Sequence, residues 1–352
     1  MEKVLVTGGC GYIGSHTLIE LLAAGFEPVS IDDNSRSSAA VLDGVERVTG
    51  RRVRNRRVDL RDPGQTDACF AEHRDAVAVI HFAAYKSAPE SVALPLRYYD
   101  NNITSLLNAL AGTERYRLPC FIFSSSCAVY GQPDRLPVTE DAPLAEPGNP
   151  YARTKQVGEH IIRDLAPRSR TGFAALRYFN AVGAHPSGEV GEVPWGEPDN
   201  IVPRLTRAAI DRLPEFVVHG DDYDTRDGTC VRDYVHVSDI SRAHVLAIAY
   251  LRNLTHGGQA TANPGVFNLG SGTGTTVLEA VRAVERASGR KLRCRTGPRR
   301  PGDIAAIYAS SERAAAELGW RPRFDIDEIA RTAWQWEQRQ TGAAVRPGEA
   351  GA

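Results

Sequence analysis

The stretch TGGCGYIG, from Thr7 to Gly14, follows a short apolar run at Val4–Val6 and precedes a helical pattern that Gly25 ends. Its glycines are spaced G-x-x-G-x-x-G, which lets the chain turn tightly and lets a pyrophosphate approach the backbone. The N-terminus of the following helix offers unpaired N–H groups and a favourable dipole to such phosphates. The stretch therefore predicts the phosphate-binding turn of a dinucleotide-binding βαβ unit.

An acidic pair stands where such a unit needs a carboxylate. Residues 28–31 read as a second strand that ends in Asp32-Asp33, and a carboxylate at this strand end can bind both ribose hydroxyls. Two adjacent carboxylates repel a 2′-phosphate, which favours NAD over NADP, whereas the nearby Arg36 would favour the phosphate. By the same strand-end argument, Asp59 and Leu60 are expected near the adenine.

The first half of the chain alternates strand and helix patterns. Further strands are expected at residues 53–60, 77–82, 120–124 and 173–178. This alternation predicts an α/β fold with a Rossmann-type doubly wound parallel sheet. Glycine and proline become frequent from 183 to 198, which predicts a loop-rich, smaller C-terminal domain. Late helices are expected near residues 203–211, 238–250, 277–288 and 311–318.

The composition excludes several classes of protein. Of 352 residues, 42% are hydrophobic and 24% charged, which is an ordinary globular balance. The net charge of −1 argues against nucleic-acid and acidic-membrane partners held by bulk charge. We expect no membrane span and no signal peptide. The six cysteines lack C-x-x-C pairing and metal-ligand spacing, so we expect reduced thiols, no metal and a cytoplasmic location.

A Y-x-x-x-K motif runs from Tyr151 to Lys155 and places a phenol and an ammonium one helical turn apart. Free tyrosine has a pKa of about 10, so it is a poor base at neutral pH. A neighbouring cation would lower that pKa. The motif is common by chance, but here it follows both a dinucleotide turn and the serine-rich strand end Ser124–Ser126. A hydroxyl of that strand end can share a hydrogen bond with the reacting oxygen.

Longer blocks of the chain resemble the UDP-hexose 4-epimerases of the extended short-chain dehydrogenase/reductase family. Besides the glycine turn and the Y-x-x-x-K motif, the matching blocks are residues 99–102, 121–126, 149–155, 177–180, 182–188, 220–223 and 227–237. The resemblance covers roughly residues 3–322. It implies NAD-dependent 4-epimerisation of UDP-glucose and UDP-galactose through a transient 4-keto intermediate, with NAD retained between cycles.

The resemblance also implies roles for individual residues. Tyr151 matches the base, Lys155 the residue that holds the nicotinamide ribose and lowers the tyrosine pKa, and Ser126 the serine that binds the same oxygen. The implied cofactor contacts are Gly8, Gly11, Tyr12, Ile13, Gly14, Asp32, Asp59, Leu60, Phe82, Ala83, Lys86, Asn101, Tyr151, Lys155 and Tyr178. The implied substrate contacts are Ser126, Asn180, Asn200, His219, Arg232, Arg300, Asp303 and Ile307.

The domain organisation follows from these assignments. We expect residues 1–180 to form the NAD-binding Rossmann domain, with 233–270 returning to it. Residues 181–340 are expected to form mainly the UDP-sugar-binding domain, and 341–352 a flexible tail. Helices around residues 95–111 and 151–165 carry apolar residues at helical spacing. In the family such helices pair across a homodimer, so we expect a homodimer, although packing within one chain would give the same pattern.

Three other functions on this fold agree with the sequence to different degrees. A nucleotide-sugar 4,6-dehydratase needs an Asp-Glu pair beside the active serine, whereas Cys127, Ala128 and Val129 follow Ser126. A non-catalytic dinucleotide sensor could dispense with the Y-x-x-x-K motif. A 4-epimerase acting on a UDP-N-acetylhexosamine or a UDP-pentose stays open, because Ile307 is intermediate in size between the bulky and the small residues that the family places behind the sugar.

Overall fold

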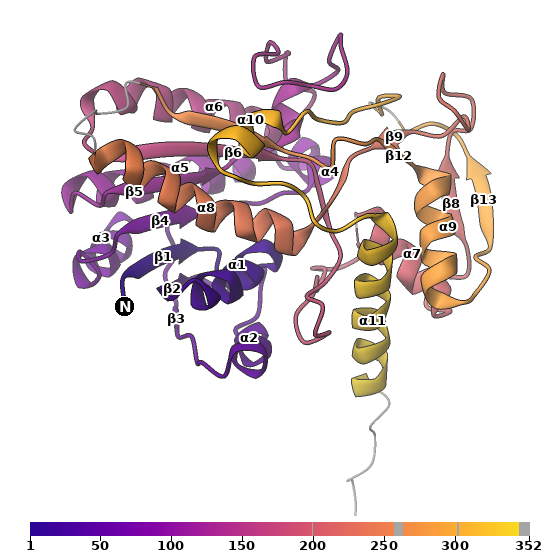
Figure 1. Ribbon diagram of the computed structural model, residues 1–352, viewed down its shortest axis with the longest axis horizontal. Coiled ribbons are helices and arrows are strands. Elements are labelled where there is room, and N and C mark those ends of the chain that lie inside the picture. Colours follow the sequence, from indigo (N-terminus) through magenta and orange to yellow (C-terminus); the bar gives the residue numbers. More distant parts are fainter. Residues whose placement is uncertain (199, 257–262, 301–302, 345–352) are drawn as a thin grey trace, which may run out of the picture.

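The computed structural model describes residues 1–198, 200–256, 263–300 and 303–344. Its centre is a seven-stranded parallel sheet in the order β11-β6-β5-β4-β1-β2-β3 (Figure 1). Outward from β1, this is the doubly wound order, with the switch point between β1 and β4. The predicted Rossmann-type fold is confirmed. The strands are β1 (Lys3–Thr7), β2 (Glu27–Ile31), β3 (Asn55–Arg56), β4 (Ala78–His81), β5 (Cys120–Ser124), β6 (Gly172–Tyr178) and β11 (Gly265–Leu269).

Helices cover both faces of the sheet, as its nearly continuous apolar strands require. Alternate residues of β1 point to opposite faces: Val4 and Val6 belong to one hydrophobic core and Leu5 to the other. The first face carries α1 (Tyr12–Ala23), α2 (Val41–Thr49) and α8 (Val237–His256). The second face carries α3 (Pro63–Glu72), α5 (Pro95–Arg115) and α6 (Pro150–Leu165), and α4 (Ala88–Ala93) packs against α5 and α6.

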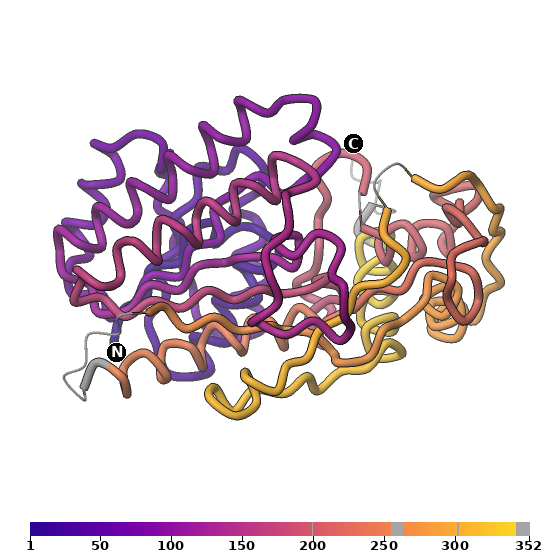
Figure 2. The backbone as a smooth tube through the Cα atoms, turned by 90° about the horizontal axis from the view of Figure 1, so that it is seen from above, coloured from indigo at the N-terminus to yellow at the C-terminus, as the bar shows by residue number. Residues whose placement is uncertain are grey.

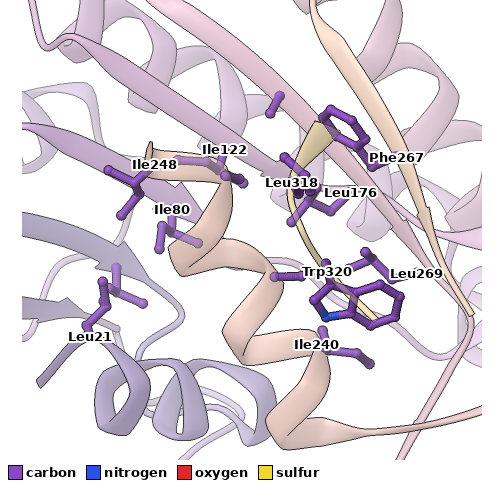
Figure 3. Packing of buried hydrophobic residues seen from close by; sticks show 14 of the residues in the cluster. Leu21, Ile80, Ile122, Leu176, Ile240, Ile248, Phe267, Leu269, Leu318 and Trp320 are labelled. Atoms are coloured by element: carbon purple, nitrogen blue, oxygen red, sulfur yellow. The ribbon is translucent and has the colours of Figure 1, made fainter. Parts of the chain in front are cut away.

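Late segments of the chain complete the first face. Figure 3 shows Leu21 of α1, Ile240 of α8 and Trp320 packed over the strand residues Ile80 and Ile122. The indole of Trp320 is fully buried, and its Nε1 donates a hydrogen bond of 2.8 Å to the carbonyl oxygen of residue 239. The short helix α10 (Glu312–Glu317) precedes it. The Rossmann layer therefore contains residues from both halves of the sequence.

A smaller part lies beside the carboxyl ends of the strands. It contains α7 (Ile201–Ala209), α9 (Val277–Ser288) and α11 (Ile326–Ala344), with β8 (Phe216–His219) paired to β13 (Cys294–Gly297). These elements share a separate hydrophobic core. Figure 2 shows α8 with the first part and the orange coil of α9 toward the opposite end. The connecting pairs are β7 (Asn180–Val182) with β10 (Tyr234–His236) and β9 (Val231–Arg232) with β12 (Thr275–Thr276).

Two elements differ from expectation. The strand expected at residues 53–60 is only two residues long, because β3 is an edge strand that pairs with β2 at two positions and is flanked by arginines. Helix α11 was not predicted, and it includes residues 341–344, which the sequence assigns to a tail. Its buried face, with Ile329 and Trp334, packs in the core of the smaller part, and that core is assembled from distant segments. Residues 345–352 lie outside the described residues.

Three further observations bear on the predicted class. All six cysteines are free thiols. Within the residues that the structure describes, no three His, Cys, Asp or Glu side chains are grouped so that they could hold a metal ion. The helices in the same part of the chain are all too short or too polar to cross a membrane.

Candidate active site

A cavity of about 460 Å³ opens at the carboxyl ends of the parallel strands, beside the switch point between β1 and β4. Residues from the ends of β2, β5 and β6 and from the loops after β1 and β4 line it. All of the cofactor contacts expected from the sequence are among them, together with three of the expected substrate contacts. These lining residues are Gly8, Gly11, Tyr12, Ile13, Gly14, Asp32, Asp59, Leu60, Phe82, Ala83, Lys86, Asn101, Ser126, Tyr151, Lys155, Tyr178, Asn180 and Asn200.

The glycine turn forms a cradle that side chains would fill. Gly8 has φ +70°, and a Cβ there would lie 2.9 Å from the backbone nitrogen of Ala83. A Cβ on Gly14 would collide with the carbonyl oxygen of Gly8. Gly11 is the N-cap of α1 and contributes no side-chain cap, so the first N–H groups of the helix remain available to an anion. The turn therefore fits the pyrophosphate of a dinucleotide.

The carboxylate of Asp32 is fixed at the end of β2. Its Oδ2 accepts a hydrogen bond of 3.1 Å from the backbone N–H of Cys10, and its Oδ1 accepts bonds from Asn34 N–H (2.9 Å) and Ser37 Oγ (2.8 Å). Burial raises the pKa of Asp32, and these hydrogen bonds act in the opposite direction. A carboxylate has about four acceptor sites, so capacity remains for ribose hydroxyls in the cavity.

Helix α6 presents the phenol and the ammonium of the Y-x-x-x-K motif to the cavity. The helix begins where Asn149 Oδ1 accepts a bond of 2.9 Å from Ala152 N–H, with Pro150 in the first turn. Lys155 is buried and donates a hydrogen bond of 2.7 Å to the carbonyl oxygen of Ser124. Its Nζ lies 5.9 Å from the centroid of the Tyr151 ring.

Burial shifts the pKa of both ionisable groups of the motif. Burial raises the pKa of Tyr151, and a hydrogen bond with Ser126 acts in the opposite direction. Burial lowers the pKa of Lys155 to about 8, and the nearby charge of Glu159 opposes this shift. The ammonium of Lys155 is directed to the backbone carbonyl of Ser124, and desolvation is the largest influence on the Tyr151 phenol. The expected lowering of the tyrosine pKa by Lys155 stays a prediction.

A buried polar network supports the strand end beneath the motif. Glu159, one turn beyond Lys155 on α6, accepts bonds of 2.9 and 2.6 Å from Arg177 of β6 and one of 2.5 Å from Ser125 Oγ. Both members of the ion pair are 3% exposed. Arg177 also donates to the Tyr130 hydroxyl at 2.8 Å. The network fixes α6 against β5 and β6 and so positions the motif.

The sequence did not single out Glu192, which also lines the cavity. Its carboxylate accepts a bond of 2.9 Å from Lys86 Nζ and bonds of 3.0 and 3.3 Å from Asn200 Nδ2. It thus links an expected cofactor contact to an expected substrate contact. Trp195, which is 65% exposed, lines the cavity from the same loop. No sequence motif marks Glu192, because its partner Lys86 lies 106 positions away in the chain.

The remaining expected substrate contacts lie outside the set of residues that line this cavity. Arg232 donates to Asp303 at 3.3 Å and to the carbonyl oxygen of Ile304 at 2.8 Å. Ile307 is buried, and its N–H donates to Val231 over 3.1 Å. Burial lowers the pKa of His219, and the charge of Arg300 acts in the same direction. These five residues belong to the strands and loops around β8, β9 and β13.

Comparison with known proteins gives concordant results. Residues 4–270 match the model of the family described as "NAD dependent epimerase/dehydratase family". The chain is 45% identical over 335 residues to UDP-glucose 4-epimerase of Bacillus subtilis (strain 168), and the match covers 95% of this chain and 96% of that protein.

Two solved structures are similar over nearly the whole chain. One is UDP-glucose-4-epimerase from Stenotrophomonas maltophila with bound NAD and formylated UDP-arabinopyranose, with a TM-score of 0.92 and 42% identity, covering 97% of this chain and 100% of that one. The other is UDP-glucose 4-epimerase from Bifidobacterium longum in complex with NAD+ and UDP, with a TM-score of 0.89 and 43% identity, covering 96% and 99%.

Proposed function

The chain belongs to the NAD dependent epimerase/dehydratase family, and on this premise we propose that it interconverts UDP-glucose and UDP-galactose by NAD-dependent epimerisation at C4 of the hexose. One observation carries the proposal: Tyr151, Lys155 and Ser126 line the same cavity as the glycine turn and Asp32. A dinucleotide held by the turn and the carboxylate shares this cavity with the only phenol–ammonium pair that the sequence marks as catalytic.

The residues around the turn are suited to NAD. The α1 N-terminus binds the pyrophosphate, and Asp32 accepts hydrogen bonds from the adenosine ribose. Lys155 and Lys86 also line the cavity, and we assign them to the nicotinamide half. When bound, NAD accepts a hydride from C4 of the sugar and returns it, and its positive ring favours the ionised form of a nearby phenol.

The chain's own residues manage the proton and the orientation of the sugar. Tyr151 takes the proton of the 4-hydroxyl and returns it when the opposite epimer forms. Ser126, which bonds Tyr151, also bonds the sugar oxygen and keeps it within reach. Lys155 stabilises the phenolate once Tyr151 has lost its proton, since a buried ammonium interacts strongly with an anion nearby.

The UDP moiety is assigned to the smaller part of the molecule. We assign Asn180 and Asn200 to the cavity side of the substrate, and His219, Arg232, Arg300, Asp303 and Ile307 to the nucleotide and the sugar. Guanidinium groups suit a diphosphate because their planar donors match its oxygen atoms. Contacts to the diphosphate hold the substrate in place while the 4-keto sugar rotates. The rotation turns the opposite face of C4 toward the nicotinamide.

The test uses purified protein with no NAD added. UDP-galactose is incubated with it and the 4-epimer is followed by NMR. We expect conversion to UDP-glucose, and we expect the Tyr151→Phe variant to lose it by at least about 10²-fold, the usual contribution of a general base. No conversion even with NAD supplied would exclude the UDP-hexose assignment.

The same assay with UDP-N-acetylgalactosamine and a UDP-pentose measures substrate breadth. Ile307 is buried, and its backbone N–H donates to the carbonyl oxygen of Val231. Its side chain is of intermediate size. Conversion of the acetylated sugar by the parent chain would show that Ile307 leaves room for the larger group. Loss of that conversion in an Ile307→Tyr variant, with UDP-galactose still accepted, would assign the breadth to this residue.

We further propose that the chain acts as a cytoplasmic homodimer. The six free thiols agree with a reducing compartment. Helices α4 and α5, together with the residue between them, expose large apolar side chains, and Leu96 is 82% exposed. These residues are Val92, Leu94, Leu96 and Leu107. Sedimentation of the parent chain as a dimer, and of a Leu96→Asp/Leu107→Asp variant as a monomer, would support the proposal, whereas a monomeric parent chain would contradict it.

A further inference from the structure

The β2–α2 loop places a cation at the adenosine end of the cavity. Arg36 follows Asp32 by one short loop, and both residues line the cavity. An unpaired arginine in this position is the group that accepts the 2′-phosphate of NADP. Asp32 and Asp33 oppose that phosphate, so the state of Arg36 decides how strongly the site discriminates between the two cofactors.

The guanidinium of Arg36 is engaged by a carboxylate from another element. Its NH2 lies 2.5 Å from Oε1 of Glu90 on α4, and its Cζ lies 4.8 Å from the centroid of the Tyr85 ring. The other oxygen of Glu90 accepts a hydrogen bond of 2.9 Å from the Tyr98 hydroxyl. Arg97 lies over the same Tyr85 ring at 5.1 Å. Glu90 and Tyr85 themselves line the cavity.

This network holds Arg36 in one place. The hydrogen bond from Arg36 is the largest influence on Glu90 and lowers the pKa of its carboxyl group, so Glu90 is ionised at neutral pH. A guanidinium that donates to a carboxylate and stacks on an aromatic ring has lost much of its rotational freedom, so it is fixed in this direction. Turning it toward a 2′-phosphate would remove the closest cation from Glu90 and leave Arg97, whose NH1 lies 3.9 Å from Oε1, and the Tyr98 hydroxyl as its partners.

The second arginine that lines the cavity is paired in the same way. Arg61 donates from Nε and NH2 to both oxygens of Asp59, at distances between 2.7 and 3.2 Å. The walls at this end therefore carry two arginines that are each paired with a carboxylate, besides the acidic Asp32 and Asp33. A ribose with a free 2′-hydroxyl fits this environment, whereas a phosphate with a charge of about −1.5 to −2 does not.

We propose that Glu90 is a specificity-determining residue for the cofactor: by holding Arg36 against Tyr85 it withholds from a 2′-phosphate the cation that the loop sequence would otherwise supply. The inference rests on the proposed binding of NAD. It goes beyond the carboxylate at the end of β2, because it assigns part of the discrimination to a residue on α4 that need not touch the cofactor.

The decisive variant is Glu90→Gln, which keeps the size of the side chain and removes its charge. Purified holoprotein is incubated with an equimolar mixture of NAD+ and NADP+ until the bound ratio is constant. It is then separated from free nucleotide and denatured, and the released nucleotides are quantified by chromatography. We expect the bound NADP+ to NAD+ ratio to rise at least tenfold over the parent chain. Arg36→Asn added to Glu90→Gln should abolish the rise.

A matched control separates the local effect from a general change in charge. Glu72 pairs with Arg56 at an exposed position of the same domain, outside the residues that line the cavity. Glu72→Gln makes the same chemical change and should leave the bound ratio at the parent value. If Glu90→Gln does not fold, as judged by circular dichroism, Glu90→Ala is measured in its place, because it also releases Arg36.

The outcomes are distinguishable from failure of the proposed function. An unchanged ratio in the folded Glu90 variant, with NAD+ still bound, would overturn the inference and leave the proposed function intact. A rise that persists after Arg36 is replaced would also overturn it, because the released cation would not be the cause. A parent chain that binds neither nucleotide would refute the proposed function itself and, with it, the inference.

Discussion

The Nζ atom of Lys155 lies 2.7 Å from the carbonyl oxygen of Ser124, so a residue of α6 donates directly to the last residue of β5. The Ser124 hydroxyl is in turn 2.5 Å from that of Tyr178, at the end of β6. One lysine thus connects the helix that carries Tyr151 with two strand ends that line the cavity. Arginine is longer and has a wider head group, so it does not fit this buried position without displacing the strand end.

The first prediction concerns this lysine. Lys155→Met keeps the apolar stem and removes the ammonium, so the phenolate of Tyr151 loses its stabilising charge. We expect kcat for UDP-galactose to fall at least about 10²-fold. The assay is steady-state epimerisation with saturating NAD added, so that weaker cofactor retention does not mask the effect. A variant with kcat within a factor of three of the parent value would contradict the assignment.

The buried ion pair beneath the site gives the second prediction. Glu159→Gln removes the charge that neutralises Arg177, and both side chains are 3% exposed. Breaking such a pair leaves an unpaired buried cation, and we expect the free energy of unfolding in urea to fall by about 3–5 kcal/mol. The exposed pair between Glu72 and Arg56 provides the control. Glu72→Gln should change the free energy of unfolding by less than about 1 kcal/mol. Equal effects in the two variants would contradict the prediction.

A third prediction follows from buried neutral histidines. Burial lowers the pKa values of His16, His81 and His236 from 6.5 to about 3. Between these values the unfolded chain binds protons that the folded chain does not, so stability that is fully present above pH 6.5 is lost as the pH falls toward 3. Well below pH 6.5, each histidine should contribute about 1.4 kcal/mol per pH unit.

Urea unfolding at pH 7.5, 6.0 and 5.0 measures this dependence. His81→Asn is a suitable variant, because an asparagine amide can replace the Nδ1 atom that lies 2.9 Å from the Thr7 hydroxyl. Whatever its stability at pH 7.5, the variant should lose less free energy of unfolding than the parent between pH 6.0 and 5.0. An identical slope in both proteins would show that His81 titrates normally in the folded state.

The fourth prediction concerns Glu192, the acceptor shared by Lys86 and Asn200. Glu192→Ala frees both side chains, and we expect a KM for UDP-galactose that is about tenfold higher, with a smaller change in kcat, because a positioning contact rather than a reacting group is lost. Glu146→Ala is the control, since Glu146 pairs with Arg153 at the surface. A fall in kcat alone would contradict a positioning role.

The parts of the site that the sequence predicts are those marked by short motifs. The glycine turn, Asp32 and the Y-x-x-x-K motif each depend on neighbours within a few residues, and the structure places all of them on one cavity. Parallel strands in the doubly wound order bring their carboxyl ends together, so strand-end residues such as Ser124 and Tyr178 meet without any sequence proximity.

Contacts between distant segments explain what the sequence did not predict. Lys86 and Glu192 are 106 positions apart, and Arg36 and Glu90 are 54 apart. No sequence periodicity marks such pairs, because each of these charged residues, taken alone, is typical of a solvated surface. Helix α11 is a similar case. Its apolar face is buried only because it packs against α7 and α9, which come earlier in the chain.

The most direct test of the central claim is the fate of the hydrogen on C4. UDP-galactose with deuterium at C4 is incubated with the purified protein in ordinary water, and the product is analysed by NMR and mass spectrometry. We expect UDP-glucose that retains the deuterium at C4, because the hydride returns to the sugar from which it came. Product that carries solvent hydrogen at C4 would contradict this expectation, since the chain would then invert the centre by proton exchange and Tyr151 would not act on the 4-hydroxyl.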